Sequence, residues 1–347
     1  MRKLKKEIFI KNVAIGKNHP IAIQSMTNTK TCDITSTVSQ IKSLEQIGCD
    51  IIRVAVVDEN DAHAISEIKK QINIPLVADI HFDYKLAIES IKAGADKIRI
   101  NPGNIGSKEN LKKIIDIAKE YNIPIRIGVN SGSVEKEFLD QFGGPTIEAM
   151  VKSLDSHIKY FESQNFTNLV LSIKTTNLED TIEVNKILNE RYDYPLHIGL
   201  TESGTDTSGT VRSSFALGTL LSQNIGDTIR VSLTTDPSLE ITIAKEILAM
   251  THHLVKPTLI SCPTCGRTAY NMMPIVKEVE KYLNTINKDI KVAVMGCVVN
   301  GPGEAKHADI GIAGGLKKGV LFKKGEIIKT IPEEDIIKEL INEIEKM

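Results

Sequence analysis

The hydrophobic residues of this chain follow two alternating spacings from residue 21 to about residue 249. Short runs of Ile, Val and Leu are each followed by a longer segment whose apolar residues recur every three or four positions, as in 111–119. The short runs predict strands and the longer segments predict helices. Strands are expected at 21–26, 50–56, 75–82, 97–100, 124–129, 168–174, 195–201 and 229–233.

Strands that alternate with helices form parallel sheets with right-handed crossovers. Eight such units within about 230 residues fit a closed (β/α)8 barrel, which typically takes about 250 residues. An open, doubly wound sheet is the alternative, but no Gly-x-Gly-x-x-Gly follows the first strand. The sequence therefore predicts an α/β protein whose residues 1–255 form an N-terminal TIM-type barrel.

The pattern changes after Lys256-Pro257, which we interpret as a linker. Strands are expected at 259–261, 291–295 and 309–312, with a helix at 270–283. A turn centred on Gly315, a hairpin through 323–325 and a final helix at 333–345 follow. Residues 256–347 are thus predicted to form a small α+β domain.

The composition is that of a globular protein, with 347 residues, 41% hydrophobic and 25% charged. The formal net charge of −1 provides no overall field for nucleic acid or an anionic membrane. No apolar run approaches the roughly 18 residues of a membrane span, and no long apolar stretch follows the basic start. We expect a cytoplasmic protein that binds neither nucleic acid nor membrane.

Polar residues occur where barrels carry their function, at the carboxyl ends of the strands. Residues two apart on a strand share a face, so pairs such as Arg99 and Asn101 are expected to point into one space. The residues at these ends are Arg53, Asp79, His81, Arg99, Asn101, Arg126, Asn130, Lys174, Thr201, Glu202, Arg230 and Ser232.

The charges in this set are unequal, with five Arg and Lys residues against Asp79 and Glu202, a net charge of +3. Several cations in one enclosed mouth are expensive to desolvate unless an anion joins them. Arginine also matches phosphate oxygens in bidentate geometry. We therefore expect a ligand with several negative charges, aided by the glycine-rich segment 101–106. The alternative interpretation is that individual arginines form ion pairs at the rim.

Five cysteines argue against a disulfide framework and favour a reducing compartment. Cys262 and Cys265 form a Cys-x-x-Cys, and Cys297 follows 32 residues later. Three interpretations remain open: a closed zinc site completed by His307, a redox pair that leaves Cys297 unused, or an iron–sulfur cluster with one weaker ligand. Glu304 and His307 are the candidate fourth ligands. The glycines around Cys297 favour the cluster, because they allow close backbone approach.

Six segments together resemble one family, although none would be specific alone. They are 25–29 (SMTNT), 78–84 (ADIHFDY), 98–106 (IRINPGNIG), 128–133 (GVNSGS), 262–267 (CPTCGR) and 300–304 (NGPGE). The combination is similar to the IspG/GcpE family, the 4-hydroxy-3-methylbut-2-enyl diphosphate synthases of the non-mevalonate isoprenoid pathway. The resemblance extends from about residue 11 to residue 315 and fits the two-domain bacterial form.

The resemblance implies reductive ring opening of 2-C-methyl-D-erythritol 2,4-cyclodiphosphate, with loss of a hydroxyl and use of two electrons from flavodoxin or ferredoxin. It implies a 4Fe-4S cluster held by Cys262, Cys265, Cys297 and Glu304. It also implies a homodimer in which the cluster domain of one chain caps the barrel of the other. The diphosphate would lie on Arg53, Arg99, Asn101, Arg126, Asn130, Lys174, Thr201, Arg230 and Ser232.

Roles for the acidic residues follow as hypotheses. A carboxylate is a harder and more exchangeable ligand of iron than a thiolate, so Glu304 is expected to give way to a substrate oxygen. Glu202 is the candidate proton donor to the departing hydroxyl, with Asp79 and His81 orienting or relaying. Glu202 anchoring an arginine is the alternative. The rival function is a phosphate-handling transferase or aldolase barrel with a structural zinc domain.

Overall fold

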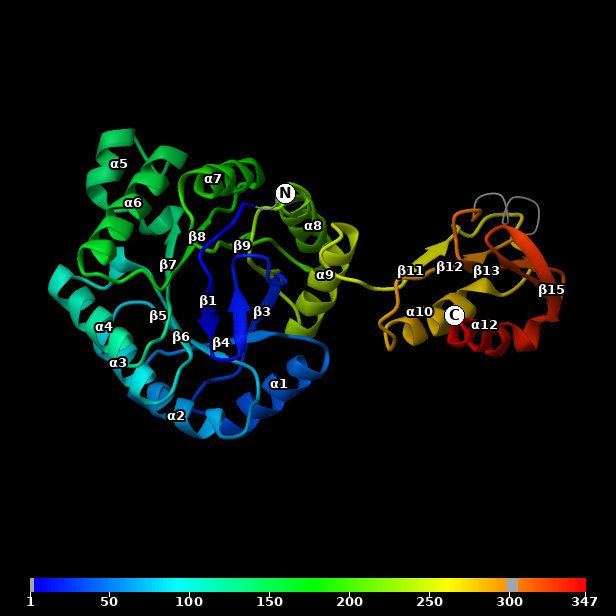
Figure 1. Ribbon diagram of the computed structural model, residues 1–347, viewed down its shortest axis with the longest axis horizontal. Helices are drawn as coiled ribbons and strands as arrows, with labels where there is room; N and C mark the ends of the chain where they lie inside the picture. Colours follow the sequence, from blue (N-terminus) through cyan, green and yellow to red (C-terminus); the bar gives the residue numbers. More distant parts are fainter. Residues whose placement is uncertain (1–2, 298–304) are drawn as a thin grey trace. The chain divides into compact units, whose positions relative to one another are not determined.

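The computed structural model describes residues 3–297 and 305–347. The chain divides into two compact units, Met1–His253 and Leu254–Met347. In Figure 1 the first unit contains the strands from blue to green with helices around them, and the second contains the small sheet from yellow to red. Within the described residues, none of the helices combines the length and the apolar character that crossing a membrane requires.

The first unit is built around eight parallel strands. Their order is β8-β7-β6-β5-β4-β3-β10-β9, and a parallel bridge between Leu171 and Leu196 connects β8 to β9. The sheet is therefore a nearly closed barrel, which confirms the predicted fold class. The strands are β3 (Ala22–Met26), β4 (Ile51–Ala55), β5 (Leu76–Ile80), β6 (Lys97–Ile100), β7 (Ile125–Asn130), β8 (Leu169–Lys174), β9 (His197–Gly199) and β10 (Thr228–Arg230).

Helices cover the outside of this barrel. Most begin after an Asp, Asn, Ser or Thr whose side chain accepts a hydrogen bond from the first turn, as Asp58 does from the Asp61 amide. The helices are α1 (Ile34–Gln46), α2 (Glu59–Lys69), α3 (Tyr84–Lys92), α4 (Lys108–Glu120), α5 (Lys136–Phe142), α6 (Ile147–Ser163), α7 (Leu178–Arg191), α8 (Asp206–Ser222) and α9 (Pro237–Met250), with short 3-10 turns η1 (Pro102–Asn104) and η2 (Ser131–Ser133).

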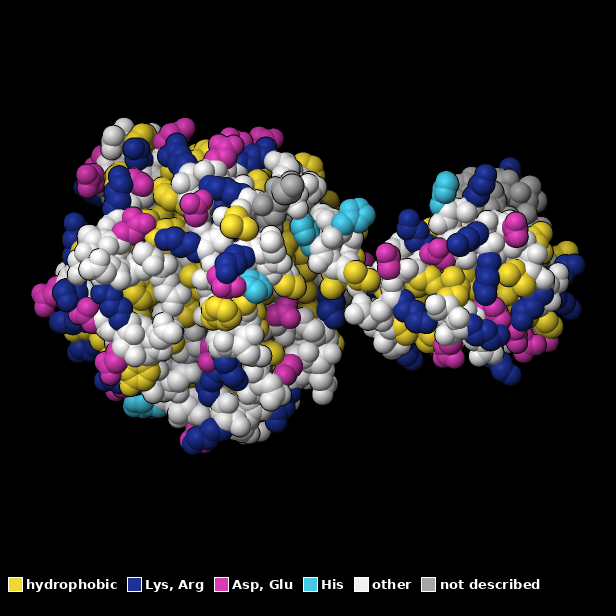
Figure 2. Space-filling view, viewed as in Figure 1, with side chains coloured by type: hydrophobic (Ala, Val, Ile, Leu, Met, Phe, Trp, Pro, Cys, Tyr) yellow, Lys and Arg dark blue, Asp and Glu magenta, His cyan; other side chains and the backbone are white. Residues whose placement is uncertain are grey.

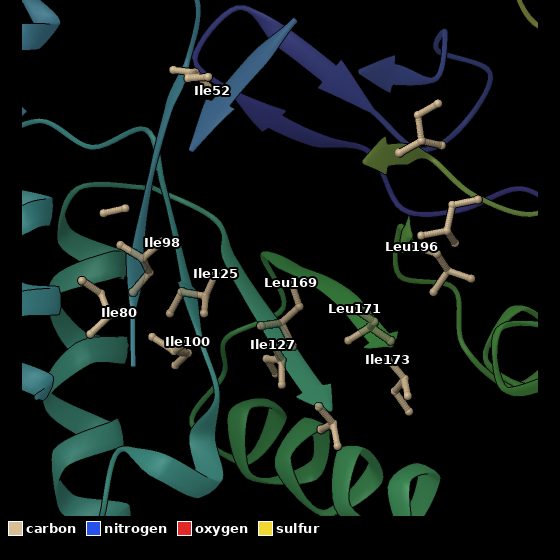
Figure 3. Packing of buried hydrophobic residues seen from close by; sticks show 14 of the residues in the cluster. Ile52, Ile80, Ile98, Ile100, Ile125, Ile127, Leu169, Leu171, Ile173 and Leu196 are labelled. Atoms are coloured by element: carbon tan, nitrogen blue, oxygen red, sulfur yellow. The ribbon is translucent and has the colours of Figure 1, made fainter. Parts of the chain in front are cut away.

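Strand alternation divides the side chains between two environments. Ile80, Ile98, Ile100 and Ile127 point outward to the helices and are fully buried there (Figure 3). Their neighbours along each strand point into the barrel. The apolar outer face thus fixes the register, and through the register it fixes which polar side chains meet inside.

An antiparallel hairpin that the sequence analysis did not predict precedes the barrel. It consists of β1 (Ile8–Ile10) and β2 (Val13–Ile15). Its three buried isoleucines form one cluster with the first inward-facing residues of four barrel strands. The hairpin therefore closes the amino-terminal end of the barrel with apolar side chains. The cluster contains Ile8, Ile10, Ile15, Ala22, Ile51, Val77 and Val170.

The described residues of the second unit form a five-stranded mixed sheet with two helices, which agrees with the predicted α+β class. β11, β12 and β13 run parallel, and β14 and β15 continue the sheet antiparallel. The turn expected at Gly315 lies one position later, because Gly315 ends β13 and Lys317 takes the left-handed conformation. The elements are β11 (Thr258–Ser261), α10 (Met272–Leu283), β12 (Lys291–Met295), β13 (Ile310–Gly315), β14 (Lys318–Lys323), β15 (Glu326–Pro332), η3 (Glu333–Asp335) and α12 (Ile336–Glu345).

Candidate active site

A cavity of about 300 Å³ opens at the carboxyl ends of the barrel strands. Ten of the twelve strand-end residues named from the sequence line it, because they occupy inward positions on successive strands. Met26, Gly128, Ser172 and Leu200 line it as well, and the sequence analysis did not single them out. The predicted lining residues are Arg53, Asp79, His81, Arg99, Arg126, Asn130, Lys174, Thr201, Arg230 and Ser232.

Two predicted residues do not line the cavity. Asn101 is buried beside η1, where its side-chain oxygen has no hydrogen-bond partner in the described part of the chain. Glu202 follows Thr201 in a left-handed backbone conformation with an exposed side chain. Among the described residues Glu202 has no ion-pair partner, so no arginine there is anchored by it.

Asp79 is the anion at the centre of the cavity wall. Its carboxylate accepts a hydrogen bond from Arg99 Nη1 at 3.0 Å and lies 3.6 Å from Arg53 Nε. His81 Nε2 lies 3.5 Å from the same carboxylate. Burial alone would raise the pKa of Asp79. The positive charge of Arg53, the hydrogen bond from His81 and the positive charge of Arg99 outweigh burial and lower that pKa below its usual range.

Two partners of the cavity arginines were not found from the sequence. Glu240 on α9 is buried, with Oε2 3.7 Å from Arg230 Nε and Oε1 accepting the Leu233 amide at 3.0 Å. The Met26 thioether accepts from Arg53 Nη2 at 3.0 Å. The position of Glu240 on a helix gives no sequence signal that it pairs with a residue at a strand end. Met26, in contrast, has the same parity along its strand as the other inward residues, so its place in the cavity could have been predicted.

The other two basic residues of the cavity, Arg126 and Lys174, line it without a carboxylate that pairs with them in the described chain. Arg126 is 2% exposed, and its Nε and Nη1 have no hydrogen-bond partner in the described chain. Burial, then Arg53 and Arg99, lowers the pKa of Arg126. Burial, then Arg126 and Arg230, lowers the pKa of Lys174 in the same way. The cavity thus presents donors that an anion would satisfy.

Two glycines leave room for these long side chains. A Cβ built on Gly128 would lie 3.3 Å from Arg99 Nε, and one built on Gly199 would lie 2.5 Å from Lys174 Nζ. Both glycines occupy inward positions, on β7 and β9. Any larger residue at Gly199 would displace Lys174 Nζ from its place in the cavity.

The surface charges differ from those of the cavity. On the face shown in Figure 2, Lys and Arg side chains are interspersed with Asp and Glu, and neither sign dominates. This agrees with the net charge of −1. The concentration of cations is therefore a property of the barrel interior, and a general attraction of anions to the surface is not expected.

The cysteines of the second unit lie at the ends of two neighbouring strands. Cys262 directly follows β11, and Cys297 lies two residues beyond β12. The two strands are parallel and paired from Thr258 to Ser261, so their carboxyl ends are adjacent. The Gly296 amide donates to Cys262 Sγ at 3.0 Å, which joins the two strand ends directly.

Cys265 is exposed on the turn that follows. Its amide donates to Thr268 Oγ1 at 3.1 Å, and its sulfur accepts from the Arg267 amide at 3.4 Å. Backbone N–H groups directed at sulfur suit thiolate ligands. The donor chemistry therefore fits a thiolate-bound metal centre, although no three His, Cys, Asp or Glu side chains are gathered around one point within the described residues. Glu304, the predicted fourth ligand, lies outside them.

Comparison with known proteins matches both units to one family. The GcpE TIM-barrel domain matches residues 5–245, and the GcpE protein C-terminal domain matches residues 258–346. Proteins named 4-hydroxy-3-methylbut-2-en-1-yl diphosphate synthase (flavodoxin) are similar over the whole length. That of Caldanaerobacter subterraneus subsp. tengcongensis is 59% identical over 100% of this chain and 98% of its own. That of Clostridium perfringens is 54% identical over 99% of both chains.

Two solved structures are similar to this chain over about the length of the barrel. Dihydropteroate synthase of Yersinia pestis superposes with a TM-score of 0.52 at 12% identity, covering 71% of this chain and 97% of its own. The 7,8-dihydropteroate synthase of Vibrio fischeri ES114 gives a TM-score of 0.51 at 15% identity, covering 71% and 98%. At this level of identity the likeness shows a common fold.

Proposed function

Since the chain belongs to the GcpE family, we propose that it catalyses the reductive conversion of 2-C-methyl-D-erythritol 2,4-cyclodiphosphate to 4-hydroxy-3-methylbut-2-enyl diphosphate. Its relatives are oxidoreductases that carry the name of this product. The observation that carries the proposal is the cavity of about 300 Å³ with its buried excess of arginine and lysine.

The cavity supports a cyclic diphosphate as the ligand. Among the described residues neither Arg126 nor Lys174 forms an ion pair with a carboxylate, and a phosphoryl oxygen would supply the partner that Arg126 Nε and Nη1 lack. Asp79 holds Arg53 and Arg99 in place, which orients their remaining donors before the ligand arrives. Asn130, Thr201 and Ser232 add neutral donors around the charged ones.

The reaction is balanced by two electrons and one proton. The bond between C2 and its phosphate oxygen breaks, which opens the ring and leaves a linear diphosphate. The bond between C3 and its hydroxyl also breaks, and the C2–C3 double bond forms. The proton converts the departing hydroxyl to water. We assign this proton to Glu202, with His81 and Asp79 orienting the ligand.

A 4Fe-4S cluster is proposed as the resident cofactor. Cys262, Cys265 and Cys297 would hold it together with Glu304, and the Gly296 amide that donates to Cys262 Sγ supports this assignment. When bound, such a cluster supplies electrons one at a time. The relatives are named for flavodoxin, so we propose flavodoxin as the electron donor.

We also propose a homodimer in which the cysteine-bearing unit of one chain caps the barrel of its partner and completes the active site there. Mixing Arg126→Met with Cys297→Ser subunits tests this arrangement. Random pairing should add about a quarter of the wild-type activity to what the separate variants retain, because one site of each mixed dimer has both intact parts. If each chain caps its own barrel, mixing adds none.

The proposed activity itself is tested by reconstituting the protein with iron and sulfide without oxygen. Turnover of the cyclodiphosphate with a strong one-electron reductant, together with a broad absorption band near about 400 nm, is expected. A colourless protein that retains zinc and leaves the cyclodiphosphate unchanged would refute the proposal.

A further inference from the structure

A lysine lies inside the barrel below the cavity. Lys97 is two residues before Arg99 on β6 and therefore points to the same interior. Its side chain is fully buried, and its Nζ has no hydrogen-bond partner among the described residues. Its register partner on β5 is Val77, a member of the apolar cluster that closes the barrel. Lys97 thus lies between the apolar closure and the cavity.

The neighbouring inward positions are polar and also buried. Gln24 on β3 has an unpartnered side-chain amide within the described chain. His197 on β9 and Thr228 on β10 are paired in register, with His197 Nδ1 2.7 Å from Thr228 Oγ1. These groups are neutral or weakly basic. None of them provides the negative charge that a buried ammonium requires.

The ionisable groups around Lys97 are mostly cationic. In addition to burial, the positive charges of Arg126 on β7 and Arg53 on β4 lower the pKa of Lys97, and Lys97 in turn lowers the pKa of His197. The nearby carboxylate, Asp79 on β5, is already paired with Arg53 and Arg99. Burial, then Arg126 and Arg53, lowers the pKa of Lys97 well below its usual value. A fully buried ammonium without a hydrogen-bond partner is costly, so the side chain is expected to be an uncharged amine while the cavity holds no anion.

We propose that Lys97 supplies a further positive charge beneath the cavity when a ligand binds. Its amine is uncharged when no anion is present and protonated when a dianion lies on the arginines above. Two residues along a strand span about 7 Å, so the ligand's charges would lie close enough to stabilise the ammonium. The inference deepens the proposed function, on which it rests, because it takes the ligand to be a dianion.

The proposal makes anion binding depend on pH. A group that gains a proton on binding makes affinity fall as pH rises between its pKa in the empty and in the occupied protein. One proton corresponds to a change of about tenfold in Kd per pH unit. Below this interval Lys97 is charged in both states, and above it Lys97 is neutral in both.

Methanedisulfonate is the probe, because it resembles two linked phosphoryl groups and keeps its two negative charges at every pH used. Calorimetric titration in two buffers of different ionisation enthalpy measures the protons taken up. We expect uptake in the wild-type protein, and less in Lys97→Met by an amount that approaches one proton. The Kd values of the two proteins should converge as pH rises. Lys92→Met, an exposed lysine on α3, serves as the matched control.

The outcomes separate this inference from the function on which it rests. Binding without proton uptake in the wild-type protein, or equal uptake in Lys97→Met, overturns the role of Lys97 and leaves the anion cavity intact. In the latter case the proton goes to another group such as Lys174 or His197. Failure of the wild-type protein to bind methanedisulfonate overturns the cavity assignment as well.

Absence of proton uptake in the wild-type protein overturns the proposal even if a substituted barrel does not fold, whereas uptake is assigned to Lys97 by the substituted proteins. Met has the length of the lysine stem and no unpartnered polar atom, so Lys97→Met is expected to unfold at a temperature no lower than the wild-type protein. Lys97→Gln is the second variant, and it should show the same loss of uptake.

Discussion

The barrel cavity and the cysteine-bearing turns differ in how their functional side chains are held in place. In the cavity, charged side chains stand on strands, and Asp79 and Glu240 hold three arginines by ion pairs. The cysteines follow their strands on turns, and Cys265 is exposed. Side chains fixed by a sheet keep their geometry before a ligand binds, whereas thiols on turns can be drawn together when a metal binds. The two regions should therefore respond differently to substitution.

The largest expected effect is that of Cys297→Ser. Loss of one thiolate should abolish turnover and remove the absorption band of the reconstituted protein. The barrel is a separate compact unit, so its affinity for methanedisulfonate should not change. Iron analysis, turnover and calorimetry on the same preparation measure all three. Weakened dianion binding in this variant would show that the two regions are not independent.

Glu202→Gln should lower kcat by about 10²–10⁴-fold, the usual contribution of a general acid. Because Glu202 does not line the cavity, the Kd for methanedisulfonate should stay the same. Steady-state kinetics and calorimetry separate the two effects. Full turnover in the variant would remove Glu202 as the proton donor and leave the anion cavity as described.

Asp79→Asn should destabilise the barrel by about 3–5 kcal/mol, because Arg53 and Arg99 would lose their buried partner. The lowered pKa of Asp79 gives the pH dependence. Its stabilising effect is present above about pH 4, its usual value when unfolded, and is lost as pH falls further. Chemical denaturation between about pH 3 and 7 should show this loss in the wild-type protein and not in the variant.

The smallest expected effect is that of Arg126→Met, which should weaken methanedisulfonate binding by about 10–100-fold. Stability of the empty protein should hold or rise, since the substitution removes a buried cation with unpartnered N–H groups. The opposite signs of the effects on binding and stability distinguish Arg126 from Asp79. A marked fall in unfolding temperature would show that Arg126 has a structural partner instead.

Strand parity explains why most of the cavity could be predicted from the sequence. Arg53, Asp79 and Arg99 each lie within a strand between apolar residues that point outward, so their inward direction follows. Glu240 could not be placed in this way, because its pairing with Arg230 depends on how α9 packs on the barrel. The three-residue strands of the amino-terminal hairpin were too short to give a periodic signal.

In the second unit the sequence predicted the strands of the sheet but not the conformation of the turns that carry the cysteines. The runs at 291–295 and 309–312 are apolar enough to mark buried strands, and both are observed. The relative positions of Cys262, Cys265 and Cys297 depend on turn conformations and on what the sulfurs bind. Spacing alone therefore indicated the donor atoms without fixing how they come together.

The apolar closure by Ile8, Ile10 and Ile15 has a kinetic consequence. With that end of the barrel sealed, molecules reach the arginines only from the carboxyl ends of the strands. In the proposed reaction the diphosphate product would leave by the route along which its precursor arrived. We expect release of this trianion from so many positive charges to limit turnover, and inhibition by added product to be competitive with the substrate.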